Sequence, residues 1–350
     1  MIDYLIVGQG LAGSLLAHEL MRRGQRVRVL DDGHRSSSSQ VAAGLLNPLA
    51  GMRFNAHPRT AEWLPAMQAC YRDLARELDL PPLLHHLPMR RLFRSPQQRR
   101  FYRRRREDPA TAPWVGEAFD ASAAPPGVRA PHGGFLQSQT GYVDLPPLLA
   151  GMRRWLAAQD ALRERPVATD AVRPGPDGVR LGDEQARHLV FCEGWKLRDN
   201  PWFGWLPLQP DQGEILRLRA PRPLSREILN GAHWLVPLAE GDYRFGATHE
   251  HHRLDGRPTP EGLAALREGL AGLLTRSDDI EVVEHAAGVR PATADRNAFL
   301  GTHPEQPRLH LFNGFGARGA LSIPWYARRM ADYLLQGRPL PAEADLARHA

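Results

Sequence analysis

The N-terminal glycine motif is the sequence feature that most constrains the fold of this chain. An apolar run, Tyr4–Val7, leads directly into residues 8–13, whose sequence GQGLAG has the spacing G-x-G-x-x-G. In this motif Gly8 makes a tight turn, Gly10 lets the backbone approach a pyrophosphate, and Gly13 lets the next helix pack closely on the strand. The sequence therefore predicts a strand, a glycine turn and a helix that together bind a dinucleotide.

An acidic residue follows the second apolar run, Val27–Leu30, at the position where a dinucleotide-binding fold needs one. Between the two runs, Ser14–Arg23 has the pattern of a helix whose N-terminus faces the glycine turn. The unpaired N–H groups and partial positive charge of such a terminus favour a diphosphate. A carboxylate at the end of the second strand accepts hydrogen bonds from ribose hydroxyls, so Asp31 is predicted to bind the adenosine half. A structural turn in an unrelated α/β protein is the alternative.

The size and composition of the chain fit two lobes around one cofactor. It has 350 residues, a mass of 39.1 kDa and 42% hydrophobic residues, enough to bury a sizeable core. No run approaches the roughly 18 apolar residues that a membrane helix needs. No basic stretch precedes the first apolar run, so we expect a cytoplasmic protein without a membrane span. Cys70 and Cys192 lie far apart and form no CxxC pair, which favours buried, unreactive thiols.

Arginine dominates the positive charge of the chain, which carries a formal net charge of +6. Nine arginines lie between Arg90 and Arg106, a density that suits a polyanion such as tRNA. Ser95 stands where it can cap a helix beginning at Pro96, and consecutive arginines spread around such a helix instead of forming one stripe. A solvated helix and a tRNA contact both stay open.

The remaining segments alternate between helical and extended patterns. Helices are expected at residues 60–78, 148–158 and 324–335, and strands at residues 89–93, 185–191 and 309–312. The small residues of segment 36–48 permit close backbone approach to a flat ligand, and segment 107–133, rich in Pro, Ala and Gly, is expected to form a surface loop. Turns at residues 230–231 and 240–242 indicate an antiparallel sheet between residues 213 and 249. The glycine-rich turn 313–320 leads into a helix, as the turn at residues 8–13 does. The two turns can therefore bind one extended ligand from both sides.

Seven separate motifs, taken in order, resemble those of the FAD-dependent amine oxidoreductases of the D-amino-acid oxidase and glycine oxidase superfamily. The resemblance runs over nearly the whole chain. The motifs are GQGLAG at residues 8–13, AAGLL at 42–46, GYVD at 141–144, FCEGW at 191–195, GAT at 246–248, GVRP at 288–291 and the glycine turn at 313–320.

One branch of that superfamily is most similar in its motifs. Residues 43–49, 316–321 and 335–341 resemble the FAD oxidase half of the bifunctional enzyme that makes 5-methylaminomethyl-2-thiouridine in tRNA. The methyltransferase half of that enzyme is absent here. Phe315 stands where glycine oxidases have a histidine, and their arginine in that loop falls one position away from Arg318.

The resemblance implies an α/β fold of the D-amino-acid oxidase type, with a Rossmann-like FAD-binding domain and an inserted antiparallel-sheet substrate domain. The FAD-binding domain is expected at residues 1–85, 141–205 and 286–350. The substrate domain is expected at residues 86–140 and 206–285. FAD is expected to bind noncovalently and in an extended form, with the substrate lobe over its isoalloxazine ring.

The resemblance also implies which residues form the site. Arg290, Arg318 and His249 are the expected catalytic residues. The expected cofactor-binding residues are Gly8, Gly10, Leu11, Ala12, Gly13, Asp31, Asp32, Ala42, Ala43, Gly44, Leu45, Val167, Gly194, Trp195, Gly288, Arg290, Gly314, Phe315, Gly316, Ala317, Arg318, Gly319 and Ala320.

Arg290 is expected to hold a substrate carboxylate, because the planar fork of a guanidinium pairs with both carboxylate oxygens. The alternative is a structural salt bridge to Glu284 or Asp295. Arg318 is expected beside the flavin, either near its pyrimidine end, where positive charge favours the anionic reduced form, or as a second contact to the substrate carboxylate. The alternative is a guanidinium turned to solvent.

His249 and His251 would share one face of a strand, which raises the possibility of a metal site, but no matching acid or cysteine cluster supports one. We therefore expect no metal site and interpret His249 as a pocket residue. Trp234 and Tyr243 are either apolar walls of the pocket or plain core aromatics.

The reaction implied by the resemblance is oxidation of the C–N bond of a small amino acid or N-substituted glycine. Hydride passes to flavin N5 and the resulting imine hydrolyses, so the protein contributes orientation and electrostatics. Two alternatives stay open at this point. One is an oxidase acting on a carboxymethylaminomethyl-type nucleoside in tRNA, and the other is a flavin-binding protein without turnover.

Overall fold

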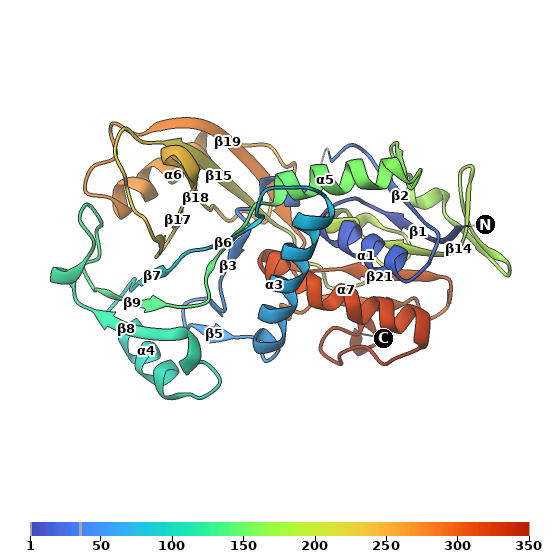
Figure 1. Cartoon of the computed structure of the whole chain (residues 1–350), viewed down its shortest axis with the longest axis horizontal. Coiled ribbons are helices and arrows are strands. Elements are labelled where there is room, and N and C mark those ends of the chain that lie inside the picture. Colours follow the sequence, from blue (N-terminus) through green and yellow to red (C-terminus); the bar gives the residue numbers. More distant parts are fainter. Residues whose placement is uncertain (1, 35–36, 350) are drawn as a thin grey trace.

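The computed structural model describes residues 2–34 and 37–349, so Ser36 at the start of the small-residue segment lies outside the described residues. Two large sheets form the two halves of the molecule (Figure 1). The first sheet and the helices α1, α5 and α7 lie in the right half of the view, and the second sheet lies in the left half. This is the predicted α/β architecture.

The first sheet has a parallel core in the order β11-β2-β1-β14, with β21 on the other edge of β14. An antiparallel hairpin and an additional edge strand complete it. Its strands are β1 (Ile2–Val7), β2 (Val27–Asp31), β11 (Leu162–Glu164), β12 (Arg173–Gly175), β13 (Gly178–Leu181), β14 (Glu184–Phe191), β20 (Phe299–Thr302) and β21 (Leu309–Asn313).

Both faces of this sheet are buried, which explains why β1 reads as one continuous apolar run. Tyr4 and Ile6 pack into a core with the helices, whereas Leu5 and Val7 pack into a core on the opposite face. The helices that contribute most to the first core are α1 (Leu11–Arg22), α3 (Thr60–Glu77), α5 (Leu145–Ala158) and α7 (Gly319–Gln336).

The second sheet has the order β19-β15-β18-β17-β16-β7-β9-β8 and is antiparallel except between β16 and β7. Its strands are β7 (Met89–Leu92), β8 (Val115–Phe119), β9 (Gly134–Gln137), β15 (Asp211–Arg219), β16 (Ile228–Asn230), β17 (Trp234–Pro237), β18 (Asp242–Gly246) and β19 (Glu281–Arg290). The expected turns at residues 230–231 and 240–242 do join antiparallel strands. Helix α6 (Pro260–Leu273) packs on one face through Leu266 and Leu270.

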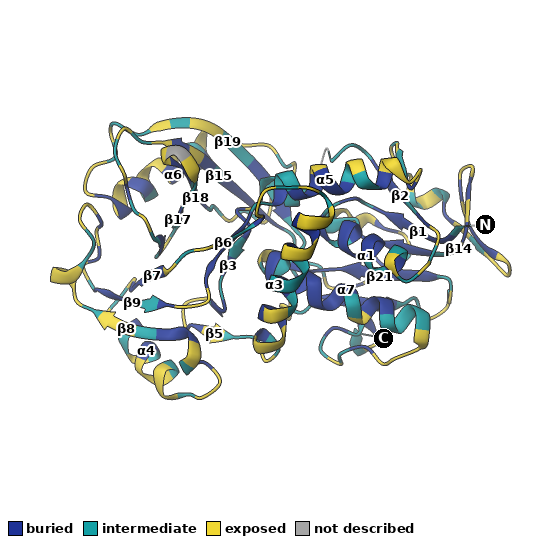
Figure 2. Ribbon diagram, viewed as in Figure 1, coloured by how far each residue is buried: buried dark blue, intermediate teal, exposed yellow. Residues whose placement is uncertain are grey.

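Short elements connect the two halves. They are α2 (Ser38–Val41), β3 (Leu45–Leu46), β4 (Leu49–Ala50), β5 (Asn55–Ala56), β6 (Leu84–His86) and β10 (Gly141–Val143). Strands β3, β10 and β6 form a small sheet of their own, as do β4 and β5. Figure 2 shows β1 and its neighbours largely buried, whereas the outer helix α4 (Gln98–Glu107) is largely exposed.

Three expectations about local structure are wrong. The segment 107–133 is not all loop, because it contains β8, which pairs with β9 just after the segment. Helix α4 begins at Gln98 without a cap from Ser95; instead the Gln98 side chain accepts a hydrogen bond from the Arg94 N–H at 2.7 Å. Helix α7 begins at Gly319, five residues before Pro324, so this proline lies inside the helix instead of starting it.

The expected boundary at residue 286 falls within β19. This strand stays hydrogen-bonded to β15 as far as Arg290. A single strand therefore runs from the outer part of the second sheet to the junction with the first. The domain boundary expected at residue 286 was placed from motif positions alone, so it divides one continuous strand.

Candidate functional site

One cavity of about 520 Å³ lies between the two sheets and is lined by residues of both. Its size is within the range of small-molecule and cofactor sites, roughly 300 to 1,000 Å³. At one end it is bounded by the turn between β1 and α1, and at the other by one face of the second sheet. The cavity therefore has a nucleotide end and a sheet end.

Tight backbone packing forms the nucleotide end. Gly8 has a φ of +101°, and a Cβ on it would lie 2.6 Å from the carbonyl oxygen of Cys192. A Cβ on Gly13 would lie 1.9 Å from the Gly8 carbonyl oxygen. Gly13 does not line the cavity; it lets α1 pack against the turn. The sequence motif therefore exists for steric reasons at both positions.

Hydroxyl groups stand beside the start of α1. A Cβ on Gly10 would lie 3.4 Å from Ser39 Oγ and 3.6 Å from Ser37 Oγ. Ser39 Oγ accepts a hydrogen bond from the Leu11 N–H at 3.2 Å, whereas the buried Ser37 Oγ has no partner among the described residues. An unpartnered donor beside a helix N-terminus fits a diphosphate. From the sequence these serines were predicted only to be small residues, and their position beside the start of α1 was not predicted.

The two acids after β2 have different surroundings. Asp31 Oδ2 accepts from the Gln9 N–H at 2.9 Å, and Asp31 Oδ1 accepts from the His34 N–H at 2.9 Å and from Arg153 Nη1 at 3.0 Å. Burial raises the pKa of Asp31, but these bonds outweigh it and hold the pKa below its usual value. Asp32 also lines the cavity and pairs with Lys196 at 3.0 Å.

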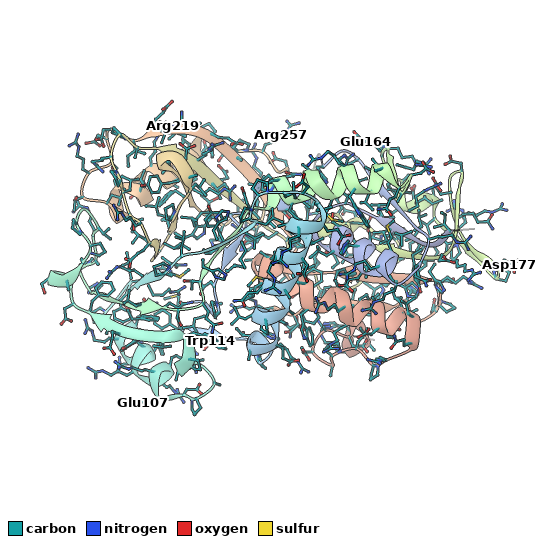
Figure 3. The ribbon with its side chains drawn as sticks, in the orientation of Figure 1. Glu107, Trp114, Glu164, Asp177, Arg219 and Arg257 are labelled. Atoms are coloured by element: carbon teal, nitrogen blue, oxygen red, sulfur yellow. The ribbon has the colours of Figure 1, made fainter. Side chains whose placement is uncertain are left out.

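Asp31 thus fixes the shape of the glycine turn, and the ribose contact expected of it stays a prediction. Arg153 completes the support from α5, since it also binds Glu164 of β11, which is labelled at the top of Figure 3.

The middle of the cavity is lined by the segment after α2 and by the loop after β14. Gly44 has a φ of +65°, and a Cβ there would lie 1.9 Å from the Val143 carbonyl oxygen. The Gly194 carbonyl oxygen accepts a hydrogen bond from Asn313 Nδ2 at 3.0 Å, which ties this loop to β21. The expected residues that line this part are Ala42, Ala43, Gly44, Leu45, Val167, Gly194 and Trp195.

Glu193 lines the same region and was missed by the sequence analysis. Burial raises the pKa of Glu193 to about 7, although its carboxylate accepts a hydrogen bond from Asn200 Nδ2 at 2.6 Å. A carboxyl group in this state is protonated in part of the population near neutral pH.

The second glycine turn closes the cavity from the other side. Phe315, Gly316, Ala317, Arg318, Gly319 and Ala320 line it, whereas Gly314 faces Thr293 and Phe299. Helix α7 starts here without a side-chain cap, so its first N–H groups are available to a ligand. The Arg318 guanidinium donates to the Arg296 carbonyl oxygen at 2.7 Å and lies over the Trp63 ring. Its expected place beside the flavin stays a prediction.

Arg290 reaches the cavity from the end of β19. Its Nη1 donates to Asp211 Oδ2 at 2.7 Å, and its side chain is 19% exposed. A Cβ on Gly213 would lie 1.9 Å from Arg290 Nη2, so the guanidinium occupies the space that a side chain at position 213 would fill. The salt-bridge alternative named the wrong acids: Asp295 pairs with Arg348, and Glu284 stands opposite Arg217.

His249 shares the acid that binds Arg290. Its Nδ1 lies 2.8 Å from Asp211 Oδ2, and its side chain is 68% exposed at the rim of the cavity. Burial raises the pKa of Asp211, but the bond from His249 and the charge of Arg290 outweigh it and lower the pKa. Asp211 is therefore an ionised acid that holds Arg290 in place.

Aromatic residues of the second sheet take separate roles. Trp234 lines the cavity, as one of the two interpretations of it expected. Tyr243 is buried in the core of the second sheet, where its hydroxyl accepts a hydrogen bond from the Leu224 N–H at 2.9 Å. Alternation along β18 turns Tyr243 away from the site, so it is not a wall of the pocket.

The arginine-rich stretch is largely engaged within the protein. Arg90 pairs with Glu227, Arg99 with Asp120 at 2.8 Å, and Arg106 with Glu117 at 2.9 Å. These pairs neutralise part of its charge, and the stretch gives no support to a tRNA contact.

The fold and the cavity together define an α/β protein of the dinucleotide-binding class, with a cavity bounded by two glycine turns and by an antiparallel sheet. The chain matches the family described as FAD dependent oxidoreductase (DAO) over residues 3–333 and belongs to it. This confirms the expected superfamily, the enzyme class of FAD-dependent oxidoreductase and the cofactor. The steric cradle at Gly8, Gly13 and Gly44 fits that cofactor.

Several characterised proteins are similar over most of this chain. Glycine oxidase of Pseudomonas aeruginosa is 28% identical over 351 residues, which cover 95% of this chain and 94% of that protein. The tRNA 5-methylaminomethyl-2-thiouridine biosynthesis bifunctional protein of Azoarcus sp. is 28% identical over 381 residues, which cover 98% of this chain and 58% of that protein.

Solved structures share the fold. Glycine oxidase from Geobacillus kaustophilus aligns with a TM-score of 0.84 and 24% identity over 99% of this chain and 97% of that one. Iminodiacetate oxidase from Chelativorans sp. aligns with a TM-score of 0.81 and 21% identity over 99% and 98%. Among the described residues, no helix is long and apolar enough to cross a membrane. The cytoplasmic location stays a prediction.

Proposed function

We propose that this enzyme oxidises the C–N bond of a small amino acid or N-substituted glycine, whose imine product then hydrolyses to a carbonyl compound and an amine. FAD, when bound, accepts the hydride at N5. The observation that carries the proposal is the Arg290 guanidinium, held at the cavity by Asp211 in the gap left by Gly213. The similarity to glycine oxidases over nearly the full length of both chains supports it.

Arg290 is the residue that would bind the substrate carboxylate. Among the described residues Arg290 donates through Nη1 to Asp211, which leaves the other donors of the guanidinium fork for a second acid. Charge-assisted hydrogen bonds of this kind contribute about 1.5 to 3 kcal/mol each. The contact fixes the α-carbon in one orientation and selects against amines that lack a carboxylate.

No side chain is required as a nucleophile in this scheme. His249 is held by Asp211 at the rim, where it would exclude water and limit the entrance. A neutral substrate amine is the reactive form, so the rise of kcat/KM with pH should follow the ionisation of that amine. Trp234 would cover the apolar part of the substrate.

The nucleoside alternative is not carried forward. This chain spans 58% of the tRNA-modifying relative, and its arginine-rich stretch is paired with acids of the protein itself. The alternative of a flavin-binding protein without turnover is addressed by the experiment that follows.

An anaerobic screen of the purified holoenzyme tests the proposal. Glycine, sarcosine or a D-amino acid should bleach the flavin absorbance, and Arg290→Lys should lower kcat/KM by roughly tenfold to a hundredfold while FAD content is unchanged. Activity of Arg290→Ala equal to that of the wild type would show that the carboxylate assignment is wrong. Absence of bleaching with every amine tried would reject the reaction.

A further inference from the structure

One buried cation of the cavity has no acidic partner. Arg91 lines the cavity from β7 and is 7% exposed. Its Nη1 and Nη2 donate only to the carbonyl oxygens of Leu49 at 3.4 Å and Gly51 at 3.2 Å. Its Nε is buried without a partner, and among the described residues no acid is paired with Arg91.

Such a charge is costly to bury alone. Burial lowers the pKa of Arg91 to about 10, which still leaves the guanidinium charged at neutral pH. Two long bonds to carbonyls and the Phe54 ring, 5.1 Å away, are weak compensation for a desolvated cation. A buried cation that faces a cavity and lacks an anion within the protein is well placed to receive one from a ligand.

The residues around Arg91 favour a negatively charged ligand group over a positively charged one. The acids that line the cavity among the described residues are Asp31 and Asp32 at the nucleotide end and Glu193 in the middle, and none of them belongs to the sheet end. The residues near Arg91 in the lining are neutral or basic, with Arg94 exposed at the mouth. The sheet end is therefore electropositive.

The FAD phosphates are not the anion in question. They are expected at the turn of Gly8 and Gly10, which lies with β1 and α1 in the right half of Figure 1, whereas β7 lies in the left half. Arg91 and Arg290 are on the same sheet, because the strand order places β19 and β7 five steps apart. At about 4.8 Å per strand, this separates the two backbones by roughly 24 Å along the sheet.

Arg91 and Arg290 nevertheless line the same face of the cavity. Arg91 pairs in register with Asn230, which pairs with Trp234, which pairs with Gly246 and through it with Ile215. Arg91, Asn230, Trp234, Ile215, Gly213 and Arg290 all line the cavity. The side chains between the two arginines are thus an amide, an indole and an aliphatic group, a surface suited to a linear spacer.

We propose that Arg91, with Arg94 at the mouth, forms a second anion subsite that receives a carboxylate or phosphate several bonds away from the reacting amine. This inference deepens the proposed function, since it assumes that Arg290 holds the carboxylate next to the amine. It defines the substrate class as amino acids or N-substituted glycines with an extended anionic tail, and it makes sarcosine a minimal substrate.

Ligand binding tests the subsite without turnover. Holoenzyme is titrated with succinate, adipate and suberate, with the matched monocarboxylates butyrate, hexanoate and octanoate, and with a carboxyalkyl phosphonate, while the flavin spectrum is followed. One of the longer dianions should bind roughly tenfold to a hundredfold more tightly than its monoanion. Preference for the phosphonate or for the dicarboxylate then identifies the source of the anion. Equal binding of dianions and monoanions in the wild type overturns the subsite.

Variants separate a ligand-binding role from a structural one. Arg91→Met should reduce the affinity for the dianion to that of the monoanion and leave monoanion binding unchanged, and Arg91→Lys should be intermediate. Arg90→Met on the same strand is the matched control, because Arg90 pairs with Glu227 outside the cavity. An equal loss for both ligand types would mean that Arg91 only supports the Leu49–Gly51 loop. If Arg91→Met does not fold, Arg91→Lys decides the same question.

Kinetics distinguish failure of this inference from failure of the proposed function. N-(carboxypropyl)- and N-(carboxypentyl)glycine are compared with N-butyl- and N-hexylglycine. If all four bleach the flavin with equal kcat/KM, the subsite is wrong and the proposed reaction stands. If dianions bind preferentially yet no glycine derivative bleaches the flavin, the reaction is wrong and the anion subsite stands.

Discussion

The two ends of the cavity are built in different ways. At the nucleotide end the backbone makes the site, and the decisive residues are glycines whose missing side chains let Gly8 meet Cys192 and Gly13 meet Gly8. At the sheet end side chains make the site, and the residues proposed to bind the substrate are Arg290 and Arg91, which line the cavity from separate strands. A site built by close backbone packing loses its shape when a side chain is added. A site built by side chains depends instead on whether those side chains are already paired with other residues of the protein.

The largest effect should come from adding one carbon to the nucleotide end. In Gly13→Ala the new Cβ would lie 1.9 Å from the Gly8 carbonyl oxygen, so the turn must open. Overpacking of this kind costs about 1 to 3 kcal/mol, and FAD affinity should fall roughly tenfold to a hundredfold. FAD content and Kd measure it, with Gly272→Ala of α6 as control because a Cβ there meets open space. A yellow, fully loaded Gly13→Ala enzyme would contradict the steric account.

A similar carbon at the sheet end should leave the cofactor alone. Gly213→Ala places a Cβ 1.9 Å from Arg290 Nη2 and must displace the guanidinium. Misplacement of a substrate-binding group by about an ångström can cost on the order of a hundredfold in rate. We expect kcat/KM to fall between tenfold and a hundredfold at unchanged FAD content. Loss of FAD from this variant would show that the sheet end also determines cofactor binding, which would contradict the difference between the two ends.

Glu193 tests whether the middle of the cavity, between the two ends, is sensitive to pH. Because its folded-state pKa of about 7 lies above its ordinary value near 4.5, its protonation stabilises the protein at low pH. That contribution is lost as the pH rises from about 4.5 through 7. Glu193→Gln should therefore raise the Tm of the holoenzyme relative to the wild type by a few degrees more at pH 8 than at pH 5.

Glu107→Gln, at the exposed outer end of α4 in Figure 3, is the control for that comparison. Equal Tm differences between wild type and Glu193→Gln at the two pH values would show that Glu193 does not titrate in this range.

The smallest effect should come from the arginine-rich stretch outside the cavity. Arg99 and Asp120 form an exposed pair at 2.8 Å, and such pairs contribute little to stability. Arg99→Ala should shift Tm by less than about 2 °C and leave kcat/KM unchanged. A clear loss of activity in this variant would show that the arginine-rich stretch contributes to the site.

The nucleotide end could be predicted from the sequence because its chemistry depends on spacing within a few residues. The motif at residues 8–13 fixes a strand, a turn and a helix whatever the rest of the chain does. The family resemblance extended this to residues 42–45 and 315–320, which line the same cavity.

The sheet end could be predicted only in part. Arg290 was identified by its motif, but its partner was not, because Asp211 joins it through strand pairing across 79 positions. Arg91 was hidden among other arginines, and only the register of β7 separates it from Arg90, which is half-buried and pairs with Glu227. The sequence carries no local signal for which arginine of a basic run is buried without an acid. Tertiary pairing decides this, and local spacing does not record it.

Gly213 has a consequence for how this enzyme could change its selectivity. The residue that governs where the Arg290 fork stands has no side chain and carries no charge. A search for specificity determinants restricted to polar or aromatic residues would pass over it. A substitution at position 213 could therefore change which acids the enzyme prefers, without replacing any residue proposed to contact the substrate.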